Sequence, residues 1–451
     1  MDINCTGIES KRDEFRKYLE QTGATEKLTS SLMMLYQEPD RPTDAIAFIR
    51  NQLCDGDYPD LEEIKAMRAE IVSLIAEKEK AVMELNVVLT NVKTSSDIEE
   101  VMAMKFGELI DDSEAKSLLK EFLTKASFEV LKNLTTEMEA TLMDNIQCGL
   151  MEREHEIGVF ASDQTAFSTF EALFTPILED IHEIEIDAEE PNASSQPDVD
   201  WGDVEEIIDV DPEGRFVDYN SITIGRALKD VRFMPTITDS TVQEVGEKIR
   251  KVLEKIVDEE FAGKYNDFIE IESEQKAKWI QEGILFNEPE DKFLKAGGTY
   301  RYWPLGRGLF LNEKKNIRVW VNEEEHLQVT SFKIGGNLRE TYERLVKFID
   351  LLADLEFARD SRWGFVAHNL KNIGNTMRVV VKVKIPQLAS PDNSEKLQDL
   401  IESNEMVSKD LENGVTELTN KKRFGVTEFD TVKGFQTGIV EIIAAEKCLT
   451  G

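Results

Sequence analysis

The sequence predicts an α+β fold in which an all-helical N-terminal module with a coiled coil precedes a small helical domain and a domain built on a mainly antiparallel sheet. Apolar residues recur at helical spacing over roughly the first 180 residues. Farther along, short apolar runs alternate with amphipathic stretches, and a strongly acidic segment separates the two patterns. The predicted organisation is a module at residues 1–95, a helical domain at 103–182, a linker at 183–217 and a sheet domain at 218–451.

The N-terminal module is predicted to contain three short helices. The first opens near Ser10 and ends at Gly23, and Pro39 and Pro42 end the second. So small a unit has little core of its own, so we expect its apolar side chains to dock a partner helix or to dimerise. The predicted partner-binding residues are Phe15, Leu19, Leu32, Leu35, Phe48 and Ile49.

A long helix is predicted next, from about Leu61 to Val92. Its apolar residues alternate spacings of three and four, which is typical of a short coiled coil, and an amphipathic helix packed on its own domain explains the spacing equally well. The predicted coiled-coil positions include Ile64, Ile71, Leu74 and Leu85.

The acidic segment from Glu183 to Glu213 holds thirteen Asp or Glu residues and no Lys or Arg. This composition predicts a solvated linker, with a docking site for a basic partner as the alternative. In the sheet domain the predicted strands are Ile317–Val321, Leu327–Phe332, Gly364–His368 and Met377–Ile385. The predicted helices there include Thr241–Glu259, Leu338–Leu355 and Glu428–Glu446.

Composition excludes several functions. The net charge of −36 argues against binding to nucleic acid or to an anionic membrane, both of which need basic patches. The four cysteines and four histidines show no metal-ligand spacing, so no metal site is predicted. No stretch resembles a signal segment or a membrane span. These features favour a reducing cytoplasmic location, which includes the interior of a cilium.

The module at residues 1–95 resembles the c-Myc-binding protein family of small adaptors. The similarity lies in S-K-R-D-E-F-R-K-Y-L-E-Q-T-G from Ser10, in L-Y-Q-E-P-D-R-P from Leu35 and in the coiled coil that follows. That family binds helices of A-kinase anchoring proteins and occurs in ciliary axonemes. The resemblance therefore implies a scaffolding role, with an amphipathic helix of an anchoring or axonemal protein as partner.

The rest of the chain, from about residue 105 to 449, resembles the phosphagen (ATP:guanido) kinases. The motifs that carry the resemblance keep the family's order and spacing, which implies the family's fold. They include F-A-S-D-Q-T-A-F from Phe160, I-L-F-N-E-P from Ile284, R-Y-W-P-L-G-R-G from Arg301, V-W-V-N-E-E-E-H-L from Val319, N-I-G-N-T-M-R from Asn372 and L-T-N-K-K-R-F-G-V-T-E from Leu418.

The resemblance assigns catalytic positions to paired carboxylates. Glu324 matches the family's catalytic glutamate, and Glu323 lies beside it. Arg378 matches an arginine that contacts nucleotide phosphate, although an arginine paired with a structural carboxylate is the competing interpretation. His368 could serve as a substitute base, but a lone histidine at a strand end is more often structural.

Other family positions have changed. Ser221, Thr223 and Gln328 stand where the family has phosphate-binding arginines, and Asn369 replaces its reactive cysteine. The region 406–415 lacks the family's arginine-glycine loop. Each lost charge-assisted phosphate contact typically costs about 2–4 kcal/mol of transition-state stabilisation. The carboxylates of Glu323, Glu324 and Glu325 would then make the entrance of the site negatively charged, and it would repel ATP.

These substitutions lead to the hypothesis of a pseudokinase, a non-catalytic adaptor or structural protein of the ciliary axoneme. Its Glu323, Glu324 and Arg378 would be vestigial, and it would need no cofactor. The first alternative is an active ATP:guanido phosphotransferase of the arginine or creatine kinase type, anchored by the module and using ATP and Mg²⁺. It would draw cations from Lys371, Arg378, Lys421 or Arg423. The second alternative is a sensor that binds nucleotide without turnover.

Overall fold

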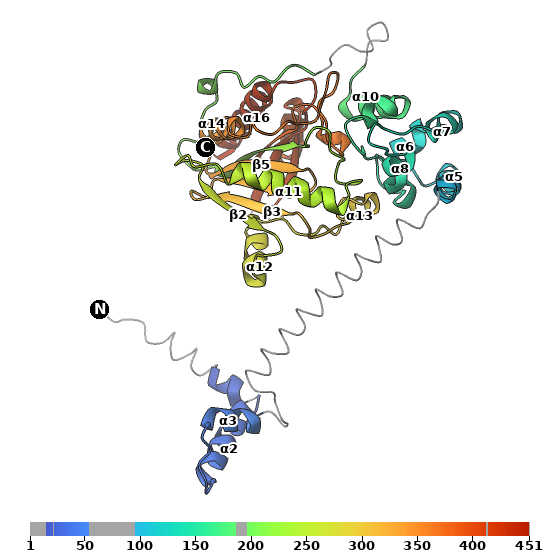
Figure 1. Cartoon of the computed structure of the whole chain (residues 1–451). Helices are drawn as coiled ribbons and strands as arrows, with labels where there is room; N and C mark the ends of the chain where they lie inside the picture. Colours follow the sequence, from blue (N-terminus) through green and yellow to red (C-terminus); the bar gives the residue numbers. More distant parts are fainter. Residues whose placement is uncertain (1–14, 21, 54–94, 186–195, 412–413, 451) are drawn as a thin grey trace. The chain divides into compact units, whose positions relative to one another are not determined.

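The computed structural model describes residues 15–20, 22–53, 95–185, 196–411 and 414–450. The chain divides into two compact units, residues 1–93 and 94–451 (Figure 1). Within the described residues, no helix is both long enough and apolar enough to cross a membrane.

The first unit contains three helical segments among its described residues. A helix covers residues 15–20, and two further helices are α2 (Ala24–Gln37) and α3 (Ala45–Leu53). Gly23 has a φ of +70°, a conformation that favours glycine, and it both ends the first helix and precedes α2. The predicted break between the first and second helices is therefore present, and α2 ends before Pro39 as predicted.

The predicted partner-binding side chains differ in exposure. Phe15 and Leu32 are exposed by 61% and 53%. Leu19, Leu35, Phe48 and Ile49 are half-buried. The predicted coiled-coil residues Ile64, Ile71, Leu74 and Leu85 lie outside the described residues.

The second unit begins with a helical domain. Its helices pack around one apolar core that includes Phe106, Leu119 and Phe174. Ser117 and Thr124 cap α6 and α7 by accepting backbone N–H bonds, which fixes where those helices begin. The helices are α5 (Ser95–Asp111), α6 (Leu118–Phe122), α7 (Lys125–Leu131), α8 (Leu142–Met151), α9 (Ala166–Thr169) and α10 (Glu171–His182).

An antiparallel sheet forms the centre of the second domain, so the predicted α+β class is confirmed. Its strand order is β2-β3-β4-β5-β1-β8-β10-β9, and each neighbouring pair is antiparallel. The strands are β1 (Val217–Arg226), β2 (Gly263–Asp267), β3 (Gly308–Asn312), β4 (Ile317–Val321), β5 (Leu327–Ile334), β8 (Met377–Lys384), β9 (Met406–Asp410) and β10 (Val415–Asn420).

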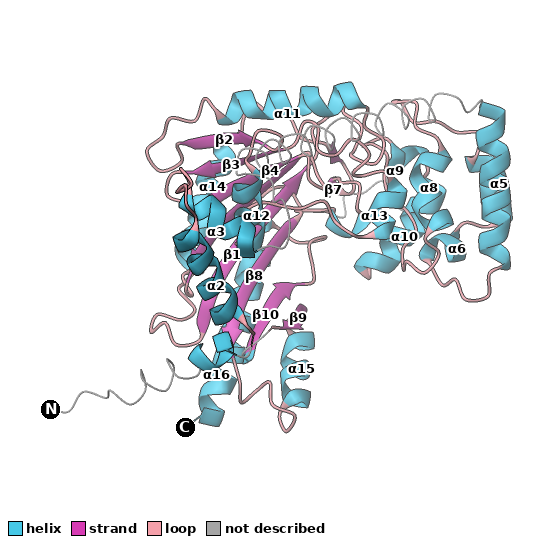
Figure 2. Ribbon diagram, turned by 90° about the horizontal axis from the view of Figure 1, so that it is seen from below, coloured by secondary structure: helices cyan, strands magenta, loops and turns pink. Residues whose placement is uncertain are grey.

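Three long helices supply the apolar side chains that cover one face of this sheet. They are α11 (Asp239–Leu253), α14 (Leu338–Asp350) and α16 (Glu428–Thr450). Figure 2 shows the helical domain beside the sheet, beyond one end of its strands. The opposite face of the sheet presents polar and aromatic side chains to a cleft, so the functional site lies there.

The remaining elements are short or lie at the edges. They are α12 (Ser273–Gln281), α13 (Lys292–Gly297), α15 (Ser394–Ser403), a 3₁₀ turn at Val204–Glu206, a second at Leu370–Asn372, and a two-stranded ladder of β6 (Arg359–Asp360) and β7 (Gly364–Phe365).

The predicted strand Gly364–His368 is too long, because only Gly364 and Phe365 lie in a strand. Beyond them the backbone carbonyl of His368 accepts a hydrogen bond from the N–H of Ala161 in the helical domain, at 2.8 Å. The chain therefore leaves the ladder to join the two domains.

The described part of the acidic segment, from residue 196 onward, contacts the sheet domain. The side chain of Gln196 donates to the carbonyl of Val426 at 2.8 Å. The carboxylate of Asp211 accepts from the backbone N–H groups of Phe216 and Val217, and Asp211 is buried. These contacts fix the chain as it enters β1.

Candidate active site

The open face of the sheet is the floor of a cleft of about 790 Å³. Side chains alternate between the two faces of a strand, so every second residue of β1, β4, β5 and β8 faces this cleft. On β4, Val319 and Val321 are buried beneath the helices, whereas Arg318 and Trp320 line the cleft. The same alternation brings Ser221, Thr223 and Gln328 to the floor.

The paired carboxylates lie in a tight turn between β4 and β5. Asn322 begins this turn with a φ of +54°, and its side-chain amide donates to the carbonyls of Val242 and Gly306, at 2.8 and 2.7 Å. The turn is thereby tied to α11 and to the segment before β3. This anchoring holds Glu323 and Glu324 in the cleft.

Glu323 is buried enough to change its ionisation. The Tyr300 hydroxyl donates to its Oε1 at 3.1 Å, and the Glu324 backbone N–H donates to its Oε2 at 2.7 Å. Burial first, and then the charge of Glu324, raise the pKa of Glu323 to about 7. Near neutral pH this carboxyl is therefore protonated in a large fraction of molecules.

Glu324 lies at a junction between two cavities. It lines the large cleft, and it also lines a smaller pocket of about 150 Å³ whose wall includes His155, Phe160, Asp291 and Asn369. Burial raises the pKa of Glu324 while the positive charges of His368 and Arg378 oppose that rise. A carboxylate between a large and a small cavity can contact one ligand in each.

The third carboxylate of the turn has its own partner. Oε1 of Glu325 lies 3.3 Å from Nδ1 of His368, and both side chains are buried. Burial is the largest single influence and opposes protonation of His368, but the charge and hydrogen bond of Glu325, together with the charges of Glu324 and Glu323, raise the pKa of the imidazole. His368 is therefore placed to neutralise Glu325, and its predicted structural role fits this geometry better than a role as a base.

Four basic side chains line the cleft: Arg318, Arg378, Lys382 and Arg423. Arg378 and Lys382 each lie 3.7 Å from one oxygen of Glu417. Arg423 donates to the side-chain oxygen of Asn372, and burial lowers its pKa to about 10, so it remains charged at neutral pH.

Sequence reasoning missed Arg318 and Lys382. The sequence places Arg318 between buried valine and isoleucine positions, and the period of two along β4 would have assigned it to the cleft. Two other basic residues, Lys371 and Lys421, do not line the large cleft and form ion pairs with Glu156 and Glu183, and Lys371 also lines the smaller pocket. Asn369 caps the 3₁₀ turn that follows it, by accepting from the N–H of Lys371.

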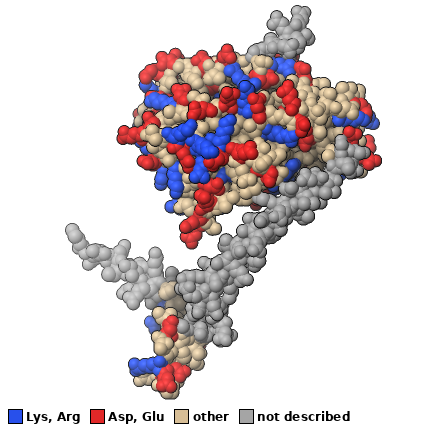
Figure 3. Space-filling view, viewed as in Figure 1, with Lys and Arg blue, Asp and Glu red and all other residues tan. Residues whose placement is uncertain are grey.

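The cleft is therefore less acidic than the sequence suggested. Its five glutamates include Glu325, which pairs with His368, and Glu323, whose pKa is raised. Figure 3 shows that lysine and arginine side chains are interspersed with aspartate and glutamate over the visible face of the second unit. A net charge of −36 does not make this cleft uniformly negative.

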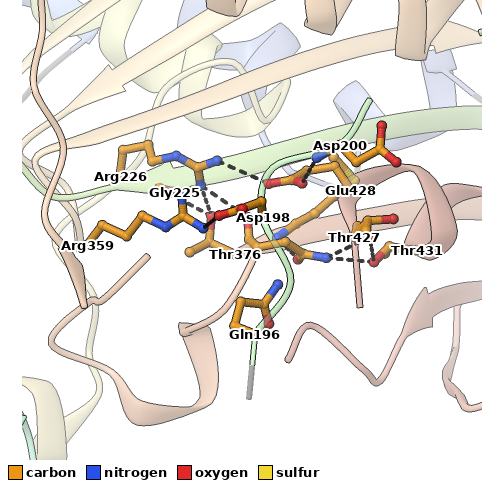
Figure 4. A network of polar contacts seen from close by, with 12 residues as sticks. Gln196, Asp198, Asp200, Gly225, Arg226, Arg359, Thr376, Thr427, Glu428 and Thr431 are labelled. Atoms are coloured by element: carbon orange, nitrogen blue, oxygen red, sulfur yellow. Dashed lines mark hydrogen bonds and ion pairs between the residues drawn. The ribbon is translucent and has the colours of Figure 1, made fainter. Parts of the chain in front are cut away.

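Arg226 belongs to the framework beside the cleft. Its guanidinium lies 3.8 Å from the carboxylate of Glu428, both side chains are buried, and it donates to the carbonyls of Gly225 and Asn375 (Figure 4). Glu428 in turn accepts from the backbone N–H of Asp200 at 3.2 Å. The network ties β1 to α16 and to the acidic segment.

Among the described residues, no cluster of three or more His, Cys, Asp or Glu side chains could hold a metal ion by itself. The carboxylates of the cleft are spread over the β4–β5 turn, strand β10 and the end of α12.

Comparisons with known proteins agree with this geometry. The model of the ATP:guanido phosphotransferase C-terminal catalytic domain matches residues 244–449, and that of the N-terminal domain matches 113–179. The model of the c-Myc-binding protein matches residues 9–88. An arginine kinase of Procambarus clarkii is 37% identical over 350 residues, which are 76% of this chain and 96% of that protein. An arginine kinase of Limulus polyphemus is 36% identical over 348 residues, again 76% and 96%.

Solved structures show the same likeness. The duplicated taurocyamine kinase of Schistosoma mansoni with bound transition state analog components superposes with a TM-score of 0.70 and 28% identity, covering 76% of this chain. This chain spans 48% of the length of that duplicated protein. A lombricine kinase superposes with a TM-score of 0.70 at 23% identity, covering 75% of this chain and 94% of that chain, and this match supports the fold.

The hypothesis of a pseudokinase without a cofactor is wrong, because arginine kinases match this chain over nearly their whole length. The hypothesis counted charge only at the family's own positions, whereas four basic side chains line the cleft. The resemblances to both families are confirmed. The chain belongs to the ATP:guanido phosphotransferase family, the phosphagen kinases, and it carries an N-terminal helical module of the c-Myc-binding protein type.

Proposed function

We propose that this chain is an active phosphagen kinase, which transfers the terminal phosphoryl group of ATP to a guanidino nitrogen. One observation carries the proposal: Glu324 lies between a cleft that is lined by four basic side chains and a smaller pocket. The cleft of about 790 Å³ is large enough for a nucleotide. The smaller pocket would accept one end of a guanidino compound whose guanidinium contacts Glu324.

The reaction needs a guanidino nitrogen that is free to attack. Glu324 accepts a hydrogen bond from the guanidinium, orients the attacking nitrogen and takes its proton. The nitrogen forms a bond to the terminal phosphorus as the bond to the bridging oxygen breaks and ADP leaves. Arg378 and Arg423, which line the same cleft, stabilise the negative charge on the transferring group.

Because the pKa of Glu323 is raised to about 7, this carboxyl is partly protonated and carries less negative charge. Glu324 is then the main negative charge beside the attacking nitrogen. Two fully ionised neighbours would repel each other and the phosphates. The expectation of no cofactor is replaced by MgATP as the cosubstrate. Mg²⁺ is held mainly by phosphate oxygens in such sites and neutralises part of their charge, which fits the lack of a metal-binding cluster among the described residues.

The test is turnover of the purified full chain with MgATP and a panel of arginine, creatine, taurocyamine and lombricine. The expected result is ATP-dependent phosphorylation of at least one compound, reduced at least 100-fold in kcat by Glu324→Gln. Glu313→Gln, at an exposed position in the turn before β4, is the matched control and should retain activity. Absence of turnover with every compound, or full activity in Glu324→Gln, would reject the proposal.

For the N-terminal module we propose a role in anchoring the kinase, either by docking an amphipathic helix of a partner protein or by dimerisation. The exposed Phe15 and Leu32 support this proposal. Light scattering and partner pull-down with the full chain and its Phe15→Asp/Leu32→Asp variant test it, and unchanged mass and unchanged partners would oppose it. We propose a cytoplasmic location; the ciliary axoneme stays a prediction that rests on the resemblance of the module.

A further inference from the structure

Two arginines stand at the ends of one row of residues across the cleft floor. Arg318 on β4 pairs with Thr330 on β5, Thr330 pairs with Thr223 on β1, and Thr223 pairs with Arg378 on β8. Neighbouring strands are ~4.8 Å apart, so the two arginine Cα atoms are separated by about 14 Å. The two threonine hydroxyls hydrogen-bond each other at 2.9 Å and form the middle of the row.

Arg318 is held in place without a counterion. Its guanidinium lies 4.5 Å from the ring centre of Trp320 and 5.6 Å from that of Phe332, and it donates to the carbonyl of Gly283. Among the described residues Arg318 forms no ion pair with a carboxylate, and its Nε–H is buried without an acceptor. A fixed guanidinium that lines the cleft and has no carboxylate partner among the described residues suits an anionic ligand.

The charges of the two arginines act on each other. Burial is the main cause that lowers the pKa of Arg318, and the positive charge of Arg378 lowers it further. The two guanidinium groups repel each other, and the two threonines between them carry no charge that could offset this repulsion. An anion that binds between the two arginines would attract both and offset it. Arginine's planar fork binds phosphate oxygens in pairs, which favours a polyphosphate in this position.

We propose that Arg318 and Arg378 form a clamp for the polyphosphate of the nucleotide, in which Arg318 supplies charge that Thr223 and Gln328 lack. This inference rests on the proposed phosphagen kinase function. Both uncharged positions lie near Arg318 in the sheet. Thr223 pairs with Thr330, which is the partner of Arg318, and Gln328 pairs with Trp320, which is two residues from Arg318. An arginine at position 223 would add a third positive charge to the row and would repel both Arg318 and Arg378. The uncharged threonine at 223 is therefore compatible with an arginine at 318.

Calorimetric titration of the full chain with MgADP tests the clamp. Arg318→Gln and Arg378→Gln should each weaken binding roughly 10- to 100-fold, the usual effect of losing a hydrogen bond to a charged group. Arg215→Gln is the control, because Arg215 is exposed and pairs only with Glu213 among the described residues. Unchanged affinity in Arg318→Gln, or no binding by the unmodified chain, would overturn the clamp.

Two further variants separate lost charge from lost packing against Trp320. Arg318→Lys keeps the charge and should retain more affinity than Arg318→Gln. Thr223→Arg in the Arg318→Gln background should recover at least tenfold of the lost affinity, and failure of this rescue in a chain whose melting temperature is unchanged would count against the clamp. MgADP binding without turnover would reject the kinase function alone, whereas turnover with unchanged affinity in Arg318→Gln would reject the clamp alone.

Discussion

The imidazole Nδ1 of His368 lies 3.3 Å from Oε1 of Glu325, and neither side chain reaches solvent appreciably. The other histidine of this region behaves differently: His326 accepts a hydrogen bond from the backbone N–H of Leu228, and burial lowers its pKa to about 4. The carboxylates of the turn therefore favour the protonated form of His368, whose pKa is raised, while His326 is neutral and structural.

Replacing His368 by glutamine should destabilise the protein by about 3–5 kcal/mol, because Glu325 would remain as a buried carboxylate without a counterion. The raised pKa of His368 means that its contribution is fully present below about pH 6.5 and is lost as the pH rises through the folded-state value. Chemical denaturation at pH 6 measures the loss. The double variant with Glu325→Gln should recover part of it; equal losses in the single and double variants would contradict the pairing.

Glu323 should make stability fall as the pH rises from about 4.5 to 7. Its pKa is raised to about 7 in the folded protein from an ordinary value of 4.5, so the folded state binds the proton more tightly than the unfolded state over that window. Glu323→Gln should remove this dependence, which is on the order of 2 kcal/mol. The measurement is the difference in unfolding free energy between pH 5 and pH 8 for both proteins. The same slope in both would contradict the raised pKa.

Removing the carboxylate of Glu428 should be among the most damaging single changes to the framework. Glu428→Ala leaves the buried charge of Arg226 without its carboxylate partner, which typically costs about 3–5 kcal/mol. Glu441→Ala on the same helix is the control, because Glu441 is exposed and accepts one hydrogen bond from Asn404. Thermal unfolding should separate the two clearly, and a similar small shift for both would show that the Arg226 pair contributes little.

The framework could be predicted from the sequence because local patterns determine it. The run Ile317–Val321 alternates apolar residues with a period of two, and it is strand β4 with the same bounds. The predicted helix Thr241–Glu259 is α11 at Asp239–Leu253, where Thr238 caps its start by accepting from the N–H of Thr241. Such signals lie within a few residues of each other and need no knowledge of distant contacts.

The site could be predicted only in part. Glu323, Glu324 and Arg378 were found by motif and do line the cleft. The period of two along β4 could have assigned Arg318 to the cleft, but its place in one row with Arg378 depends on the register of β4, β5, β1 and β8. Counting charge at expected positions could not reveal charge supplied by another strand, and that omission led to the incorrect pseudokinase hypothesis.

Glu417 should limit the affinity of the cleft for nucleotide. Its two carboxylate oxygens each lie 3.7 Å from a basic group, one from Arg378 and one from Lys382, and it sits opposite Lys382 in the β8–β10 ladder. Bound phosphate must compete with this carboxylate for the same two cations. Glu417→Gln removes the competing charge while keeping the side-chain shape, so MgADP should bind about three- to tenfold more tightly.

Calorimetric titration measures this change, with Asp218→Asn as the control because Asp218 pairs with Lys384 outside the cleft lining. The gain should shrink at high salt, since screening weakens the repulsion that the substitution removes. Weaker binding by Glu417→Gln would instead mean that the carboxylate positions Arg378 and Lys382 for the nucleotide. In that case Glu417, at 3.7 Å from both cations, would orient the side chains of Arg378 and Lys382 towards the phosphates before the nucleotide binds.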